Sequence, residues 1–370
     1  TSKPTANNLN NTGSVLALAG YQGYTQGQSR VLGQFFGGVA GMMQNAALQN
    51  SSSGARSGLS ESDIKALILQ GYNEDGSLNA NSPLQGDFVG GLVGFGGHVQ
   101  LVDCRTRSGY VLGNTFVGGV VGGLSTGTVL NDGAANNSHV FGHRYVGGVV
   151  SFNGENGKIT GMSNTGMTAA FGANAAYAGG IVGYNQVILK MPTAENTITR
   201  AKLLLPVVTE NSSILTVSAG QAGSTTVTLT DCTNALNLTA DAYVGGVVGW
   251  GENLALNNAV NGAQNSVSMG VLRSDGSLLA QPAPSADAVT GNAAGGIIGY
   301  AGGYTLLKDC QNYAGVFHKQ AAGGIAGYNA GTIQSCTQNA NLGTRQAGYN
   351  SIGGIAGVNA GTIQAGKPNN

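Results

Sequence analysis

Few side chains in this sequence of 370 residues have the chemistry of a metal or cofactor site, because only four are histidines and four are cysteines. His139 and His143 have the spacing H-x3-H, which could hold zinc on a helix. No cysteine or carboxylate lies near them in the sequence, and the zinc-protease pattern H-E-x-x-H is absent. We therefore expect neither a metal site nor a cofactor.

Cys104, Cys232, Cys310 and Cys336 all end a similar phrase, seen as "LVDC", "LTDC", "LKDC" and "IQSC". Two disulfides of a secreted protein are one interpretation. The shared position in a repeat favours another, because equivalent residues on neighbouring strands point in parallel and seldom reach disulfide geometry. We expect a column of buried free thiols, in which Cys310 and Cys336 are the only pair on adjacent copies.

Asp103, Asp231 and Asp309 directly precede three of these cysteines and are expected to face outward. Enzymes that cleave polysaccharides use clustered carboxylates. Ser335 occupies the matching place after Asp309, so no paired acid and base is evident. A glycan-cleaving enzyme is kept as an alternative to a binding protein.

An aromatic residue follows the third glycine of a recurring glycine phrase, as in Tyr184, Trp250, Tyr300 and Tyr328. Phe95 and Phe152 have the same place. If exposed, such a row would suit sugar rings or a protein partner. If buried, it would be core packing. We predict Tyr184, Trp250, Tyr300 and Tyr328 as the ligand-binding residues.

The elements that position these residues come from a repeat. The glycine phrase occurs nine times, and its first glycines lie at Gly37, Gly90, Gly118, Gly147, Gly179, Gly245, Gly295, Gly323 and Gly353. Several steps are 28 to 32 residues long by subtraction, and such a period is typical of a solenoid. Each repeat contains three strand-like pieces, so the sequence predicts an all-β, right-handed β-solenoid of about ten coils.

The glycine strand has aliphatic residues at both parities, as Val117, Val120 and Val121 show, and is expected to be apolar on both faces. We divide the chain into an N-terminal cap segment, residues 1–30, and a solenoid, residues 31–370. Inserts are expected at 50–86, 186–224 and 252–290, and "LSESDIKALILQG" in the first is expected to form a short α-helix. The piece from Thr226 is interpreted as half a repeat without its glycine half.

Composition excludes several partners. Charged residues make up 9% of the chain and the formal net charge is +0, so there is no basic surface for nucleic acid. No apolar run is long enough to span a bilayer, so we expect no membrane insertion. The sequence stops within a copy of the repeat, so we expect it to be part of a longer chain.

The phrase G-G-[ILV]-[AVI]-G-[YFW]-N, followed by "GTI" and a C-x-N turn, resembles the GLUG repeat of bacterial surface proteins. The resemblance implies a secreted, extracellular β-solenoid on a bacterial cell surface. Its expected role is that of a non-enzymatic adhesin or stalk that binds a host glycan or an extracellular protein. Such repeats also occur in the non-catalytic part of IgA1-type metalloproteases, so an ancillary repeat domain of a secreted protease is a further alternative. No catalytic residue is implied.

Overall fold

The structure of this chain is a computed structural model. It describes residues 3–13, 15–16, 25–26, 29–30, 35–54, 88–124, 129–130, 135–154, 157–170, 177–185, 227–235, 238–240, 243–262, 266–269, 271–272, 278–279, 293–317, 321–343 and 351–365. Within these ranges the chain forms strands and no helix, and no segment is a candidate for a membrane-spanning helix. The expected short helix and the insert at 186–224 lie outside the described residues.

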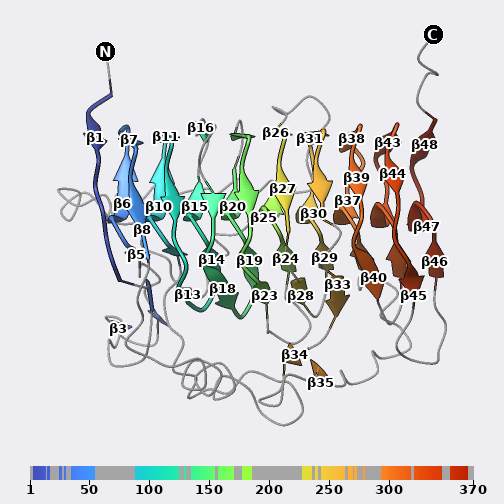
Figure 1. Cartoon of the computed structure of the whole chain (residues 1–370), viewed down its shortest axis with the longest axis horizontal. Helices are drawn as coiled ribbons and strands as arrows, with labels where there is room; N and C mark the ends of the chain where they lie inside the picture. Colours follow the sequence, from blue (N-terminus) through green and yellow to red (C-terminus); the bar gives the residue numbers. More distant parts are fainter. Residues whose placement is uncertain are drawn as a thin grey trace.

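Five long parallel sheets run side by side from one end of the molecule to the other, with the chain termini at opposite ends (Figure 1). We number them in the order in which the chain visits them. Sheets 1 and 2 are built from the glycine phrase and have nine strands each. Sheet 1 contains β5 (Phe35–Gly37), β9 (Phe88–Gly90), β14 (Phe116–Gly118), β19 (Tyr145–Gly147), β24 (Tyr177–Gly179), β29 (Tyr243–Gly245), β36 (Ala293–Gly295), β41 (Ala321–Gly323) and β46 (Ser351–Gly353). Sheet 2 contains β6 (Ala40–Gln44), β10 (Val93–Gly97), β15 (Val121–Leu124), β20 (Val150–Asn153), β25 (Val182–Asn185), β30 (Val248–Gly251), β37 (Ile298–Ala301), β42 (Ala326–Asn329) and β47 (Ala356–Asn359).

The other three sheets complete each turn of the chain. Sheet 3 contains β1 (Thr5–Asn7), β7 (Ala47–Gln49), β11 (Gln100–Val102), β16 (Val129–Leu130), β21 (Lys158–Thr160), β26 (Val227–Thr230), β31 (Leu254–Asn257), β38 (Leu306–Lys308), β43 (Thr332–Gln334) and β48 (Thr362–Gln364). Sheet 4 contains β8 (Ser52–Ser53), β12 (Arg105–Thr106), β17 (Ala135–Asn136), β22 (Ser163–Asn164), β27 (Thr233–Asn234), β32 (Val260–Asn261), β39 (Gln311–Asn312) and β44 (Thr337–Gln338). Sheet 5 contains β2 (Val15–Leu16), β13 (Tyr110–Leu112), β18 (His139–Gly142), β23 (Thr168–Ala170), β28 (Leu238–Ala240), β33 (Ser266–Met269), β40 (Gly315–Phe317) and β45 (Leu342–Gly343). Two short antiparallel pairs lie outside the sheets, β3 (Thr25–Gln26) with β4 (Ser29–Arg30) and β34 (Val271–Leu272) with β35 (Leu278–Leu279).

The chain passes through sheets 1 to 5 in order and then begins the next turn one strand further along every sheet. Equivalent residues pair in parallel, as in Phe88↔Phe116↔Tyr145. The described residues contain seven such turns and a partial one at each end, which together we call coils 1 to 9 from β5 to β48. This arrangement is consistent with a β-solenoid. A complete coil has five strands rather than the expected three, because the glycine phrase bends into two strands and the rest of the repeat forms three.

The bend in the glycine phrase explains why its aliphatic residues occur at both parities. In coil 3, Val117 on β14 joins a core between sheets 1 and 5, whereas Val121 on β15 joins a larger core lined by sheets 2 and 3. The corner between them leaves no room for side chains: a Cβ on Gly118 would lie 1.9 Å from the carbonyl oxygen of Val121, and one on Gly119 would lie 2.0 Å from that of Gly148. The paired glycines therefore form the corner where the two sheets meet.

A second bend, between sheets 3 and 4, accounts for the spacing of the cysteines. Leu101 and Cys104 are both fully buried in the larger core although they are three residues apart. Between them, Asp103 has a φ of 52°, in the left-handed region that turns the chain. Asp231 and Asp309 repeat this conformation with a φ of 54° each. Two inward positions three residues apart are therefore joined by a bend at which the aspartate faces outward, as expected.

Buried asparagine amides form a column along sheet 4 that we did not predict. Asn136, Asn164, Asn234, Asn261 and Asn312 are at most 1% exposed. In each step the Nδ2 group donates to the Oδ1 atom of the next asparagine, over 2.8 to 3.0 Å. These contacts link coils 3 to 7, and Gln338 accepts the next bond from Asn312 at 2.7 Å. The column satisfies the buried amides while holding the coils in register.

Several expected boundaries are wrong. The piece beginning at Thr226 is not half a repeat without glycines. Strands β26 to β28 follow residues 186–226 in the sequence and complete the coil whose glycine strands, β24 and β25, precede those residues. Strands β31, β32 and β33 lie inside the expected insert 252–290 but belong to sheets 3, 4 and 5. Strand β8 likewise belongs to sheet 4 although it falls in 50–86. The expected cap, 1–30, contributes β1 and β2 to the sheets themselves.

Candidate functional site: two facing columns of aromatic rings

Two columns of aromatic residues run along sheets 1 and 2 on the side away from the aliphatic cores. The first column occupies the first position of each sheet 1 strand and consists of Phe35, Phe88, Phe116, Tyr145, Tyr177 and Tyr243. The second column follows the third glycine on sheet 2 and consists of Phe95, Phe152, Tyr184, Trp250, Tyr300 and Tyr328. The predicted row of aromatic residues is therefore one of two.

Rings of neighbouring coils stack along the whole first column and, in the second column, from Tyr184 to Tyr328, whereas Gly123 separates Phe95 from Phe152. Tyr145 and Tyr177 are 5.1 Å apart between ring centroids and tilted by 12°. In the second column, Trp250 lies 3.7 Å from Tyr300 at 13°, and Tyr300 lies 5.1 Å from Tyr328 at 9°. Neighbouring strands of a sheet are about 4.8 Å apart, so parallel pairing sets this spacing. The rings are thus held rigidly by the backbone ladder.

The two columns meet edge to face. Tyr145 contacts Tyr184 at 5.3 Å and 83°, and Tyr243 contacts Trp250 at 4.8 Å and 85°. Such T-shaped pairs each contribute about 0.5–1.5 kcal/mol beyond the area they bury. The alternatives of exposed strip and core packing are therefore both partly right: the rings pack on one another, outside the aliphatic cores.

The chemical character of the columns changes along the molecule. Towards the N-terminal end the rings are phenylalanines, and Phe88, Phe116 and Phe152 are buried. From coil 4 in the first column and from coil 5 in the second, the rings carry hydroxyl or indole groups, and we call this part the tyrosine strip: Tyr145, Tyr177, Tyr184, Tyr243, Trp250, Tyr300 and Tyr328. In the first column Ala293 and Ala321 then replace the rings. Tyr300 and Tyr328 consequently have no ring opposite them within their own coils.

The four predicted ligand-binding residues all lie in the tyrosine strip but differ in exposure. Tyr184 is only 4% exposed, whereas Trp250, Tyr300 and Tyr328 are half-buried. Burial raises the pKa of the Tyr184 hydroxyl far above its ordinary value, and the neighbouring Tyr145 adds to the effect. Burial also raises the pKa of Tyr300, with a smaller contribution from Glu252. Both hydroxyls therefore stay protonated at neutral pH and can donate hydrogen bonds.

Trp250 sits at the centre of the strip. It stacks on Tyr184 at 5.9 Å on one side and on Tyr300 on the other. Its Nε1 atom is buried and has no hydrogen-bond partner within the described part of the chain. Because the chain contains one tryptophan, this indole reports on the strip alone in any spectroscopic measurement.

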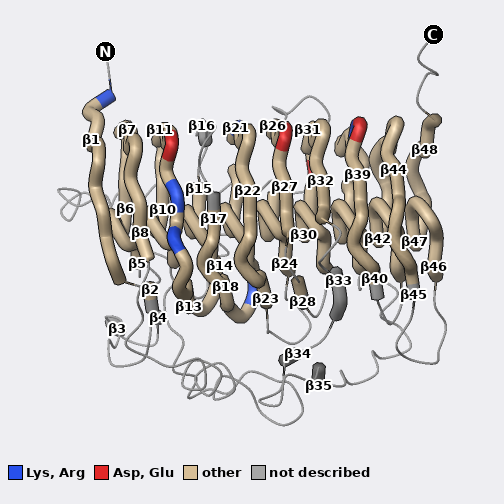
Figure 2. The backbone as a smooth tube through the Cα atoms, viewed as in Figure 1, with Lys and Arg blue, Asp and Glu red and all other residues tan. Residues whose placement is uncertain are grey.

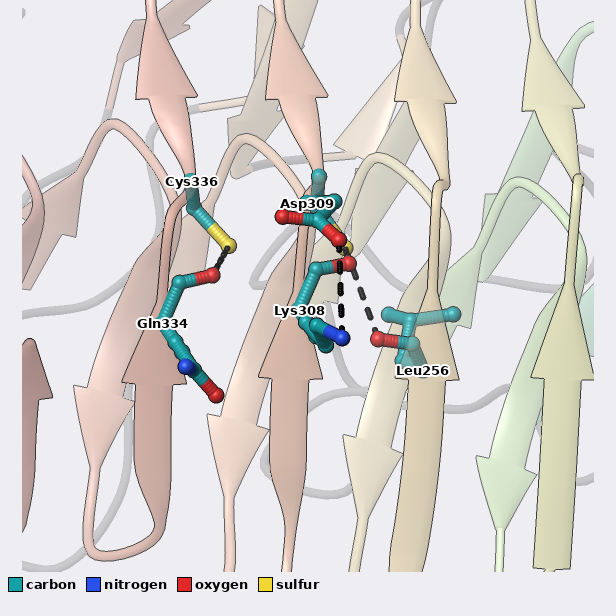
Figure 3. Close-up of polar contacts among 6 residues, drawn as sticks. Leu256, Lys308, Asp309, Gln334 and Cys336 are labelled. Carbon is teal, nitrogen blue, oxygen red and sulfur yellow. Dashed lines mark hydrogen bonds and ion pairs between the residues drawn. The ribbon is translucent and has the colours of Figure 1, made fainter. Parts of the chain in front are cut away.

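The cysteine column is confirmed as a set of free thiols. Cys104, Cys232 and Cys310 are buried and Cys336 is half-buried. The sulfur of Cys336 donates to the backbone oxygen of Gln334 over 3.3 Å (Figure 3). Cys310 makes the equivalent contact with the backbone oxygen of Lys308. Burial raises the pKa of Cys232 to about 12, whereas a hydrogen bond from Cys310 lowers that of Cys336. Cys336 is therefore the thiol best suited to react.

The histidines and aspartates do not gather into a site. The Nδ1 atom of His139 accepts a hydrogen bond from the backbone of Met167, and that of His143 lies 2.8 Å from Oδ1 of Asn114. Asp103, Asp231 and Asp309 are exposed, as expected, and belong to coils 2, 5 and 7. Figure 2 shows acidic residues widely spaced along one edge, near β11, β26 and β38. Among the described residues no three histidine, cysteine or acidic side chains are placed to hold a metal.

Sequence reasoning missed the first aromatic column, although its signal was present. Each glycine phrase from Phe88 to Tyr243 begins with Phe or Tyr two residues before the first glycine. Aligning the phrases at that position would have revealed the first column.

Comparisons with family models, curated proteins and solved structures returned no match to this chain.

Proposed function

We propose that this chain is a non-enzymatic, right-handed β-solenoid of a bacterial cell surface, an adhesin or stalk that binds a host glycan or an extracellular protein. The tyrosine strip is the observation that carries the proposal. The GLUG-like phrase supports the extracellular location, and the usual handedness of parallel crossover connections supports the right-handed coil.

The strip has the properties of a recognition surface. Tyrosine and tryptophan combine a large apolar area with a polar group, and both are enriched where binding energy concentrates. Stacking on both sides has already fixed the rings of Trp250 and Tyr300, so a ligand loses little affinity to ordering them. The low charge of the chain favours a neutral glycan or an uncharged protein surface over an ionic ligand.

A glycan-cleaving role is less well supported. It requires an acid and a base about 5–10 Å apart on either side of a glycosidic bond. No two acidic residues occupy the bends of adjacent described coils: Asn258 stands between Asp231 and Asp309 and donates a 2.7 Å hydrogen bond to Asp231, and Ser335 occupies the same bend in coil 8. The arrangement therefore favours binding without turnover.

A screen of the purified chain against glycans and extracellular matrix proteins tests the proposal. A ligand found in this way should lose at least tenfold in affinity for the double variant Tyr300→Ala, Tyr328→Ala. Tyr304→Ala is the matched control, because Tyr304 is 56% exposed and belongs to neither aromatic cluster among the described residues. Equal loss in both variants, or release of sugar fragments by the wild type, would count against the proposal.

A further inference from the structure

The ring faces of the tyrosine strip are already occupied by other rings. Tyr145 has a ring of a neighbouring coil against each face, with centroids 4.8 and 5.1 Å away and tilts of 9° and 12°. Tyr300 is covered in the same way by Trp250 at 3.7 Å and by Tyr328 at 5.1 Å. A ligand therefore cannot stack on these faces, and what remains for recognition is the outer edge of each ring with its hydroxyl group.

Five hydroxyl groups of the strip are available to a ligand. In the part of the chain that the structure describes, the phenolic oxygens of Tyr145, Tyr177, Tyr184, Tyr300 and Tyr328 make no hydrogen bond, and none of them is among the fully enclosed polar atoms without a partner. Each oxygen can therefore reach solvent. Because a tyrosine hydroxyl both donates and accepts, each can pair with a ligand hydroxyl in either orientation.

The coils place these hydroxyl groups in a regular row. Tyr145 lies in coil 4, Tyr177 and Tyr184 lie in coil 5, Tyr300 lies in coil 7 and Tyr328 lies in coil 8. Centroids are 5.1 Å apart both between Tyr145 and Tyr177 and between Tyr300 and Tyr328. The row follows the long axis of the molecule from β19 to β42 (Figure 1) and spans five coils.

The period of the row fits a linear glycan better than a peptide. An extended β-1,4-linked pyranose chain advances by about 5 Å per sugar, close to the strand spacing of about 4.8 Å. A β-strand advances by about 3.3 Å per residue, so groups on one side of it recur at about 6.6 Å and lose register with the row within two coils. An α-helix has a pitch of about 5.4 Å, but its backbone groups already pair within the helix and cannot bond to the row.

The charges beside the row favour an uncharged ligand. The guanidinium of Arg144 lies 5.7 Å from the ring centroid of Tyr145. Glu252 lies near Tyr300, where it adds to the burial that raises the pKa of that hydroxyl. One positive and one negative side chain at different coils leave the strip without a net charge. Every sugar of a neutral glycan, by contrast, carries hydroxyl groups that can pair with the row.

We propose that the tyrosine strip binds one extended, uncharged β-1,4-linked glycan chain, which lies along the solenoid with one sugar per coil from coil 4 to coil 8. The inference rests on the proposed function, because it names the ligand class of the same strip. Recognition is by hydrogen bonds at the ring edges and not by stacking on the ring faces. Affinity should therefore rise with chain length up to five sugars and should depend on the hydroxyl groups themselves.

Isothermal titration calorimetry of the whole chain with cello-oligosaccharides and chito-oligosaccharides of two to seven sugars tests both expectations. We expect the affinity for at least one series to increase up to five sugars and then to stay constant. The double variant Tyr300→Phe, Tyr328→Phe keeps both rings and removes only their hydroxyl groups. It should bind the five-sugar chain about tenfold more weakly, with an unchanged melting temperature. Tyr304→Phe is the matched control and should bind like the wild type, because Tyr304 belongs to neither aromatic cluster among the described residues.

Three outcomes would overturn the proposal: neither series binds, the affinity does not level off at five sugars, or the phenylalanine double variant binds as tightly as the wild type. The proposed function is judged separately with the variant Tyr300→Ala, Tyr328→Ala. If neither sugar series binds but a protein ligand from the screen is lost in that variant, the strip is a binding surface and only the glycan proposal is rejected. Sugars that bind the alanine variant like the wild type would reject the strip itself.

Discussion

Replacing Asn164 by alanine should destabilise the chain strongly, because this side chain connects three coils. It donates to Oδ1 of Asn234 at 2.8 Å and accepts from Nδ2 of Asn136 at 2.8 Å. It also closes its own turn, donating to the carbonyl oxygen of Gly166 at 2.9 Å and accepting from the backbone N–H of Gly166 at 3.1 Å. All of these groups are buried.

The magnitude follows from the groups left without partners. Asn164→Ala orphans the N–H of Gly166 and removes one bond from each of four further buried groups, the fourth being Oγ1 of Thr168 at 3.3 Å. A buried polar group that loses its partner costs about 1–3 kcal/mol, so we expect a loss of about 3–5 kcal/mol. Asn137→Ala is the control: Asn137 is the exposed neighbour of Asn136, and its replacement should cost no more than about 1 kcal/mol.

Urea unfolding followed by circular dichroism at the strand band measures both variants. Equal denaturation slopes for the variants and the wild type would show that the difference in midpoint reflects stability. A loss below about 1 kcal/mol for Asn164→Ala, or one no larger than that of Asn137→Ala, would refute the idea that the asparagine column holds the coils together.

Three further predictions concern single residues. Burial lowers the pKa of His143 to about 4 from 6.5, so the folded state binds fewer protons than the unfolded state between these values. Unfolding free energy should therefore fall by about 3 kcal/mol as the pH drops through that window, and a pH series should show this dependence vanish in His143→Gln. Thiol titration without reductant should find four thiols in denaturant, with Cys336 reacting first in the native chain; finding none in denaturant would contradict the thiol column. Gly246→Ala should destabilise the chain because its Cβ would lie 1.9 Å from the carbonyl oxygen of Gly296, whereas Gly303→Ala should change the melting temperature little.

The sequence predicts the repeat and its columns well, because the same residue type recurs wherever parallel pairing brings positions together. Cysteines, second-column aromatic rings and the bend at Asp103, Asp231 and Asp309 all follow from spacing. The corner at the paired glycines could not be predicted from spacing, because a continuous apolar phrase has the same sequence pattern whether the strand stays straight or bends. Only the tight contact between Gly118 and Val121 separates the two possibilities.

Features that depend on contacts between coils were harder to predict from the sequence for a different reason. The asparagines of sheet 4 look like ordinary turn residues, and their burial becomes evident only when each amide meets its counterpart in the next coil. The coil divided by residues 186–226 was missed because nothing local tells which glycine strands β26 continues. In the candidate site, the ring that faces Trp250 lies on another strand of the same coil, seven residues earlier at Tyr243.

The most direct test of the central claim, that the tyrosine strip is the ligand-binding surface, uses the intrinsic fluorescence of Trp250. As the only tryptophan in the chain, and one stacked between Tyr184 and Tyr300, it reports on the middle of the strip. Saturating amounts of a glycan or protein ligand from the screen should shift its emission and reduce its quenching by acrylamide, with the same midpoint as binding. A ligand that saturates the chain while leaving both the emission and the quenching of Trp250 unchanged would contradict the claim.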